Sequence, residues 1–283
     1  MTMAHLSHLT WQSHLRALFA IAKKGWLLFI RYPLNAVFRV LQPLIWLTPI
    51  YFLGRSFATE QGNVGFAAYS GTVDYMSFIL VGAMISSYIS SVFWGMGLSL
   101  KNEMDSGVLE SNWLAPLPRF IFLIGQTGAN LFVTTIVNAG ILLLGWLLFG
   151  FSITGNLLQA LAVVLPLLLA LYGFGFGFAA IVFMMRDANT LIDVSDYLVS
   201  LFSGSQFPVQ VLPRFLLPIS LALPLTYGLD AVRGLLINTR TLLPIPVEIL
   251  ILLAFMGVMI PLGYFVFKQV ERRSRRLGTI GMH

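Results

Sequence analysis

Long apolar stretches constrain this chain more than any other feature of its sequence. Charged residues make up 10% of its 283 residues, whereas a soluble domain carries about a quarter, because its surface must be hydrated. A lipid core of about 30 Å is crossed by a helix of about 20 apolar residues. The sequence therefore predicts an all-α integral membrane protein with six transmembrane helices, at residues 34–53, 75–98, 120–150, 157–185, 188–204 and 247–267.

The distribution of basic residues predicts how these helices are oriented. The net charge is +6, and most lysines and arginines fall in segments that a cytoplasmic N-terminus would place inside. We therefore expect a multi-pass protein of the plasma membrane, the bacterial inner membrane, with both termini in the cytoplasm. Three parts are expected: a cytoplasmic or interfacial helix at 1–33, a single six-helix transmembrane domain at 34–270 and a basic cytoplasmic tail at 271–283. The tail is interpreted as an anchor beside anionic lipid rather than a nucleic-acid-binding arm.

The segment before the first predicted span has the period of an amphipathic helix. Over residues 11–30, apolar residues recur every three or four positions, and Arg16, Lys23 and Lys24 fall between them. Aromatic residues at head-group level with lysines toward the phosphates are typical of an interfacial helix. Pro33 is expected to end it, because a proline lacks the backbone N–H that a helix needs.

A polar segment at 101–119 separates the second and third predicted spans. It is compatible with a helix and contains Glu103, Asp105 and Glu110, so it cannot lie in lipid. On the cytoplasmic side, such a segment offers a binding surface to a soluble partner. It indicates a permease that is driven from outside its own chain.

Residues 203–238 are mostly apolar but contain four prolines, at 208, 213, 218 and 224. A continuous spanning helix with these prolines would lose several backbone hydrogen bonds in lipid. Two half-helices at 212–221 and 226–236, entering and leaving the outer leaflet, fit the pattern better. Broken backbone at this depth is tolerated where protein covers it or where it lines a wet cavity, so this region is the candidate extracellular gate. The other outer loop, at 54–74, is glycine-rich and expected to be irregular.

Ionisable residues within the predicted membrane segments form another set of candidates, because each is costly there unless it is paired or functional. Arg39 lies in the first span, where it can snorkel toward the cytoplasm or pair. Asp193 and Asp196 share one helix face in the fifth span, where they either pair with a basic group or bind a cation. Asp230 and Arg233 are three residues apart, which predicts an intrahelical pair.

Motifs that would indicate an enzyme are lacking from the sequence. No Walker motif occurs, and the glycines of YGFGFGF lie in an apolar span, where Gly173 and Gly177 favour close helix packing. The four histidines lie outside the predicted spans and the chain has no cysteine, so no membrane-embedded metal site or hydrolase is expected. The sequence indicates a transport subunit rather than an enzyme, without a metal or cofactor of its own.

Two segments resemble the permeases of ABC-2 type transporters. The first is GVLESNWLAPLPR at 107–119, preceded by Glu103 and ending in Arg119, with Val108 where the family commonly has threonine. The second is SGSQFPVQVLP at 203–213, followed by PLTYGLDAVRGLL at 224–236. Together with the interfacial helix and the six predicted spans, the resemblance covers nearly the whole chain.

The resemblance implies a half-transporter that works as two permease chains, identical or related. They would act with a pair of cytoplasmic ABC ATPase subunits, which bind ATP and magnesium. The residues that would couple the permease to the ATPase are Glu103, Asp105, Gly107, Leu109, Glu110, Trp113 and Leu114. The residues that would form the extracellular gate are Phe207, Pro208, Leu212, Pro213, Pro224, Tyr227, Asp230 and Arg233.

The expected function is ATP-driven export of a hydrophobic or amphipathic substrate, such as a drug, antibiotic or lipid, from the cytoplasm or inner leaflet. Export of a lipid-linked polysaccharide is the alternative within the family. From other classes, the alternatives are an ion-coupled secondary transporter that uses Asp193, Asp196 and Asp230 as cation sites, and a membrane enzyme that acts on lipids.

Overall fold

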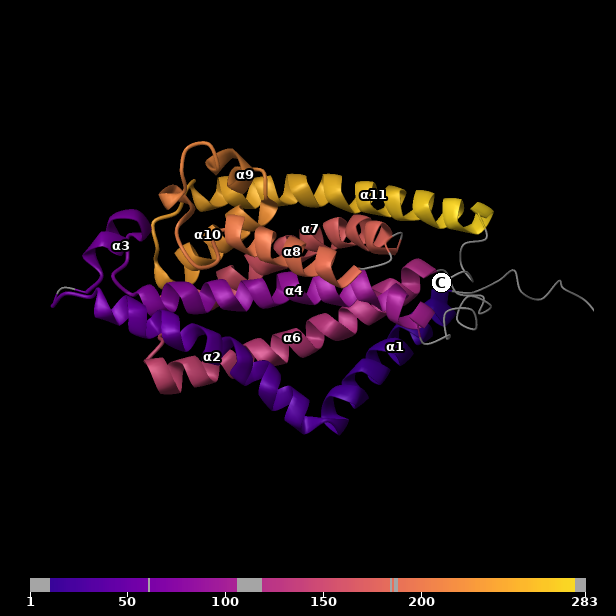
Figure 1. Ribbon diagram of the computed structural model, residues 1–283, viewed down its shortest axis with the longest axis horizontal. Coiled ribbons are helices and arrows are strands. Elements are labelled where there is room, and N and C mark those ends of the chain that lie inside the picture. The colour runs from indigo at the N-terminus through magenta and orange to yellow at the C-terminus, as the bar shows by residue number, and fades with distance from the viewer. Residues whose placement is uncertain (1–10, 61, 106–118, 184, 186–187, 278–283) are drawn as a thin grey trace, which may run out of the picture.

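The computed structural model describes residues 11–60, 62–105, 119–183, 185 and 188–277. In chain order, its helices are α1 (Trp11–Arg31), α2 (Pro33–Ser56), α3 (Val64–Ser70), α4 (Tyr75–Asp105), α6 (Arg119–Phe149), α7 (Leu157–Phe183), α8 (Ala188–Phe202), the 3₁₀ turn η2 (Val209–Val211), α9 (Leu217–Leu221), α10 (Pro224–Ile237) and α11 (Ile245–Leu277). The long helices form one bundle, with α4 near its middle and α11 along one edge (Figure 1). α1 begins and α11 ends at one end of the bundle, called here the α1 end. α3 and α9 lie at the other, the α9 end (Figure 1).

Five helices are long and apolar enough to cross a membrane, namely α2, α4, α6, α7 and α11. They confirm a multi-pass membrane protein and correspond to five of the six predicted spans. α8 occupies the predicted fifth span but has 15 residues, about 22 Å at 1.5 Å per residue, which is shorter than the hydrocarbon core. It ends just before Gly204, which adopts a left-handed conformation with φ 78°. A sixth span therefore stays a prediction.

The first two helices form a V whose apex is at Tyr32 (Figure 1). The backbone of Tyr32 leaves the helical region (φ −119°, ψ 70°) directly before Pro33, which confirms the predicted end of the first helix. α1 packs along α6, where Gly25 approaches Ala129 so closely that a Cβ at Gly25 would lie 2.7 Å from the Ala129 methyl group. Small residues allow this close packing, and the van der Waals contacts of close packing stabilise helix association in lipid.

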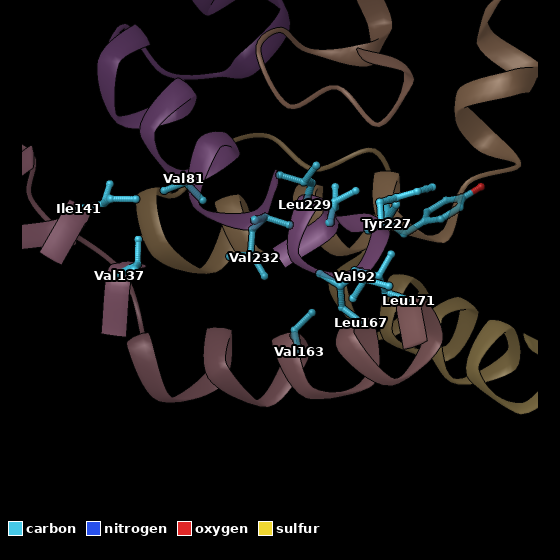
Figure 2. Close-up of a cluster of buried hydrophobic side chains, with 14 of the residues drawn as sticks. Val81, Val92, Val137, Ile141, Val163, Leu167, Leu171, Tyr227, Leu229 and Val232 are labelled. Carbon is cyan, nitrogen blue, oxygen red and sulfur yellow. The ribbon is translucent and has the colours of Figure 1, made fainter. Parts of the chain in front are cut away.

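The core of the bundle surrounds α10, a short helix that is buried along most of its surface. Leu229 and Ala231 are completely buried. Figure 2 shows Leu229 and Val232 of α10 grouped with Val92 of α4 and Leu167 of α7. α10 is covered by α4, α7 and α11, so its apolar residues lie in the interior of the bundle.

Facing glycines bring α7 and α11 together. The backbone carbonyl of Gly173 occupies the space that a Cβ at Gly263 would need, and Gly177 faces the Cα of Gly263. The prediction that Gly173 and Gly177 serve helix packing is confirmed.

The first predicted half-helix is shorter than the sequence indicates. Of residues 212–221, only α9 is helical. Leu212 is extended (φ −63°, ψ 144°) because Pro213 follows it, whereas Pro218 lies in the first turn of α9, where a proline is tolerated. At the second, predicted at 226–236, the helix α10 is present, and its role as a re-entrant half-helix of the outer leaflet stays a prediction.

The loop at 54–74 contains a helix that the sequence does not predict. In α3, Phe66 packs edge-on against Tyr75 and Phe78, with ring centroids 5.0 and 5.1 Å apart. Aromatic pairs of this geometry add stability beyond the area they bury. These long-range contacts, rather than local sequence preference, hold α3 in place.

The loop between α6 and α7 caps the C-terminus of α10. The backbone N–H groups of Thr154 and Gly155 donate to the carbonyl of Leu236 (3.1 and 3.0 Å), and that of Asn156 donates to the carbonyl of Leu235 (2.8 Å). The last carbonyls of a helix need such donors, since lipid offers none. Any side chain at Gly155 would clash with the Leu235 carbonyl. The loop therefore fastens α10 to the α6–α7 hairpin.

Candidate functional site

A cavity of about 1040 Å³ lies between α2, α4, α6 and α8. This volume is at the upper end of the range for small-molecule sites, roughly 300–1,000 Å³. All four helices line it with polar side chains, although each helix is mostly apolar. Polar groups in membrane helices are costly next to lipid and face protein or a water-filled space, so the cavity is the candidate substrate site.

The polar lining follows helical spacing on each wall. α6 contributes three residues four positions apart, Gln126, Asn130 and Thr134. α4 contributes two pairs of serines with the same spacing, Ser86 with Ser90 and Ser87 with Ser91. α2 contributes Arg39, Gln42 and Trp46. Because residues three and four apart share one face of a helix, each wall presents a continuous polar stripe.

Hydrogen bonds join α8 to α4 along one wall of the cavity. The Ser90 hydroxyl donates to the carboxylate of Asp196, whose two oxygens lie 3.0 and 2.8 Å away. One turn further, the hydroxyls of Ser86 and Ser200 are 3.2 Å apart, and the hydroxyl of Ser205 lies 3.0 Å from that of Ser200. We call these hydrogen bonds between α4 and α8 the serine ladder. It holds the Asp196 carboxylate in position through the uncharged hydroxyl of Ser90.

Four charged side chains line the cavity without pairing with one another. They are Lys24 of α1, Arg39 of α2, and Asp193 and Asp196 of α8. α8 lies on one side of α4, and α1, α2 and α6 lie on the other (Figure 1). The described residues contain no ion pair involving Asp193 or Asp196, and both alternatives for these carboxylates, pairing with a basic group elsewhere and binding a cation, stay predictions.

Arg233 forms a second polar centre, at the α9 end, and is only 3% exposed. Its Nε donates to the Phe78 carbonyl (3.1 Å), its Nη1 to the Gly204 carbonyl (2.7 Å) and its Nη2 to the Ser205 carbonyl. Its guanidinium carbon lies 3.5 Å from the centroid of the Phe78 ring, a cation–π arrangement. All three guanidinium nitrogens are thus used, and Arg233 ties α10 to α4 and to the loop after α8.

Asp230 does not pair directly with Arg233. The backbone N–H of Leu242 donates to the Asp230 carboxylate, which is also in hydrogen-bonding contact with Glu248. The predicted intrahelical pair is therefore wrong. The physical reason is that carbonyl groups of α4 and of the loop after α8 lie within reach of the arginine, while the loop before α11 supplies a donor to the aspartate.

The predicted gate residues are all described and lie at the α9 end. They are Phe207, Pro208, Leu212, Pro213, Pro224, Tyr227, Asp230 and Arg233. Tyr227 donates its hydroxyl to the carbonyl of Leu221 (2.9 Å), which joins α10 to α9. These eight described residues are separate from the lining of the large cavity, and their role as a gate stays a prediction.

The predicted coupling residues lie at or beyond the C-terminus of α4. The backbone of Glu103 and Asp105 continues that helix. The other five, Gly107, Leu109, Glu110, Trp113 and Leu114, lie outside the described residues.

The three carboxylates of the ion-coupled alternative do not form one site. Asp193 and Asp196 line the cavity, whereas Asp230 lies near Arg233 at the α9 end. Asp196 contacts Ser90 and Arg233 contacts Phe78, two positions about 18 Å apart along α4 at 1.5 Å per residue. The described residues contain no cluster of three acidic or histidine side chains that could hold a metal ion.

Comparison with known families decides where the chain belongs. Residues 16–237, from α1 to the end of α10, match the ABC-2 type transporter family. The chain belongs to this family. No curated protein gives a match.

Membership of the ABC-2 family confirms the resemblance carried by the segments at 107–119 and 203–236. ABC-2 membrane proteins are the transport subunits of ABC transporters and normally pair with a separate ATPase subunit. The chain is accordingly a permease, the transport subunit of an ABC transporter.

The sequence indicates the charged residues of the cavity but misses its neutral polar lining. Arg39, Asp193 and Asp196 stand out by charge alone. The stripe that begins at Gln126 has a visible signal, the four-residue spacing of polar side chains within the apolar stretch 120–150. That spacing predicts a polar helix face, but only the structure shows which helices share the space in front of it.

Proposed function

We propose that this permease is the membrane subunit of an ATP-driven exporter that moves an amphipathic substrate through the cavity between α2, α4, α6 and α8. The observation that carries this proposal is the polar lining on four otherwise apolar helices. A substrate with a polar head and an apolar tail would place its head among these groups and its tail against Leu47, Ile50 and Val137. The direction is outward, and the substrate enters from the cytoplasm or the inner leaflet.

The arrangement of the helix ends supports coupling to an ATPase at the α1 end. α4 ends and α6 begins there (Figure 1), so the segment 106–118 starts and finishes at that end of the bundle. The positive-inside distribution assigns the same end to the cytoplasm. A pair of ABC ATPase subunits would therefore meet the coupling residues there, and a second permease chain would complete the transporter in the inner membrane.

A lipid-linked polysaccharide is the second candidate substrate. Trp46 and Trp94 both line the cavity, and aromatic faces next to hydroxyl and amide groups suit sugar rings. Export of a free amphiphile does not require these aromatic faces. Short oligosaccharides should therefore compete with the substrate for binding only if the substrate is a lipid-linked polysaccharide.

A first test uses the natural absence of cysteine. We expect Ser91→Cys, on the cavity wall, to react with a water-soluble thiol reagent in nanodiscs, and substrate to protect it. Leu158→Cys is the matched control, because Leu158 is 80% exposed on the surface of α7 and should face lipid. Equal reactivity of the two positions would contradict a water-filled pathway.

A second test concerns the ATPase. The permease should co-purify with its cognate ABC ATPase, and Glu110→Lys should weaken that complex. Glu60→Lys, in an exposed loop at the α9 end, should leave it unchanged. A permease that recruits no ATPase, yet transports with a proton or sodium gradient, would replace this proposal by the ion-coupled alternative.

A further inference from the structure

The acidic and the basic side chains of the cavity lie on different walls. Asp193 and Asp196 project from α8, and Lys24 and Arg39 belong to α1 and α2 on the other side of α4 (Figure 1). Among the described residues, no carboxylate forms an ion pair with either base. Both kinds of charge therefore line one cavity, and neither has an ion-pair partner among the described residues.

Leaving charges unpaired in a membrane protein is costly, and such charges mark pathways for substrates. The chain neutralises the charge of the buried Arg233 with its own carbonyl groups, whereas Lys24, Arg39 and Asp193 are exposed. In the cavity it does the opposite: Asp196 is held by a neutral serine, which positions the carboxylate but leaves its charge. A ligand with a single charge would compensate one wall and leave the other without a partner.

We propose that the cavity recognises a zwitterionic head group, with its cation beside Asp193 and Asp196 and its anion beside Lys24 and Arg39. The uncharged parts of the head group lie against the serines of α4 and the stripe of Gln126, Asn130 and Thr134. This inference rests on the proposed function, since it names the class of amphiphile that the permease carries. It concerns binding, however, and can be tested without transport.

The experiment measures binding of four octyl-chain probes to the full permease in nanodiscs of an uncharged galactolipid. The probes are octylphosphocholine (zwitterionic), octyltrimethylammonium (cationic), octyl phosphate (anionic) and octyl glucoside (uncharged). Trp46 and Trp94 line the cavity, so tryptophan fluorescence reports binding. Trp46→Phe identifies the cavity signal, because the Trp94 indole also hydrogen-bonds to Asp196. Empty nanodiscs correct for partition into lipid.

We expect the zwitterionic probe to bind about tenfold more tightly than either singly charged probe, a difference of about 1.4 kcal/mol, because it gains one more charge-assisted hydrogen bond. Asp196→Asn should remove this advantage and shift the preference toward the anionic probe. Arg39→Gln should shift it toward the cationic probe. These opposite shifts are the signature of two separate charge subsites.

Two matched controls separate charge recognition from damage to the fold. Lys24→Gln should weaken binding of the zwitterionic and anionic probes, whereas Lys23→Gln, at the exposed neighbouring position outside the cavity lining, should not. Glu60→Gln should behave as the unchanged protein, unlike Asp196→Asn. All variants are compared only where their nanodiscs elute as the unchanged protein does.

The outcomes distinguish this inference from the proposed function. Equal affinity for all four probes, or tightest binding of a singly charged probe, would overturn the zwitterionic site even if ATP-driven transport were observed. Conversely, zwitterion preference with opposite shifts in Asp196→Asn and Arg39→Gln would support it even if no ATPase assembled with the permease.

Discussion

Two polar regions of this ABC-2 permease treat their charges in opposite ways. At the α9 end, each nitrogen of the Arg233 guanidinium donates to a backbone carbonyl. In the cavity, Lys24, Arg39 and Asp193 have no ion-pair partner among the described residues, and Asp196 has only hydroxyl and indole donors. The difference teaches that a membrane protein uses internally neutralised charges to hold its fold and leaves others free to meet a ligand.

The largest effect is expected when the Arg233 clamp is broken. Arg233→Met removes three hydrogen bonds and leaves the carbonyls of Phe78, Gly204 and Ser205 without their donors. We expect the free energy of unfolding to fall by about 3–5 kcal/mol, measured by SDS titration in mixed micelles. Arg214→Met, at an exposed position, is the control and should change little. If the two variants were equally stable, Arg233 would not stabilise the fold, and the proposed difference between the two regions would be contradicted.

A smaller loss is expected from Gly82→Ala. A methyl group there would collide with the carbonyl of Ser205 and the guanidinium of Arg233, so it should displace the clamp and cost about 1–3 kcal/mol. The same substitution at Gly128, where a Cβ would meet no atom within 4 Å, should be neutral or stabilise α6 by up to about 1 kcal/mol. Opposite signs in the same titration would confirm that the α9 end is packed around the clamp.

The sequence predicts the spanning helices well because hydropathy is a local property. The second predicted span, 75–98, coincides with the apolar part of α4, and the proline at 33 marks the break before α2. The partners of Arg233 could not be predicted, because Phe78 is 155 residues away along the chain. Spacing alone suggests Asp230 as its partner, and tertiary structure overrides that suggestion.

The cavity was predictable only in part, for a similar reason. Asp193 and Asp196 are conspicuous as charges in an apolar stretch. Ser90 is conspicuous only once α8 is placed beside α4, since serine occurs in membrane helices both as a packing residue and as a hydrogen-bonding group. A site made of many weakly polar residues on four helices is therefore recognised after folding, not before.

A modest effect is expected from Ser90→Ala, which removes the serine donor to Asp196. The free energy of unfolding should fall by about 0.6 kcal/mol, the average for side-chain hydrogen bonds between membrane helices. Ser91→Ala, on the same turn of α4, is the control, since its hydroxyl donates to no described residue. If both variants were equally stable, the serine ladder would position Asp196 without stabilising the bundle.

The smallest effect on stability is expected from Lys24→Gln, because the ammonium group has no ion-pair partner among the described residues. Substitutions of this kind usually change stability by less than about 0.5 kcal/mol. The same SDS titration, with Lys23→Gln as the control, measures the change. If Lys24→Gln lowered the free energy of unfolding as much as Arg233→Met, Lys24 would be a structural residue. The cavity and the α9 end would then not differ in how they use their charges.

The clip between the α6–α7 loop and α10 has a mechanical consequence. Thr154, Gly155 and Asn156 hold the last carbonyls of α10, so pulling that helix away from the hairpin would break three hydrogen bonds at once. The stretch from Pro208 to α9 has no such fastening to the hairpin in the described contacts. If the α9 end moves during a transport cycle, we expect α10 and the α6–α7 hairpin to move together as a rigid unit. The proline-rich stretch from Pro208 to α9 would then be the flexible part.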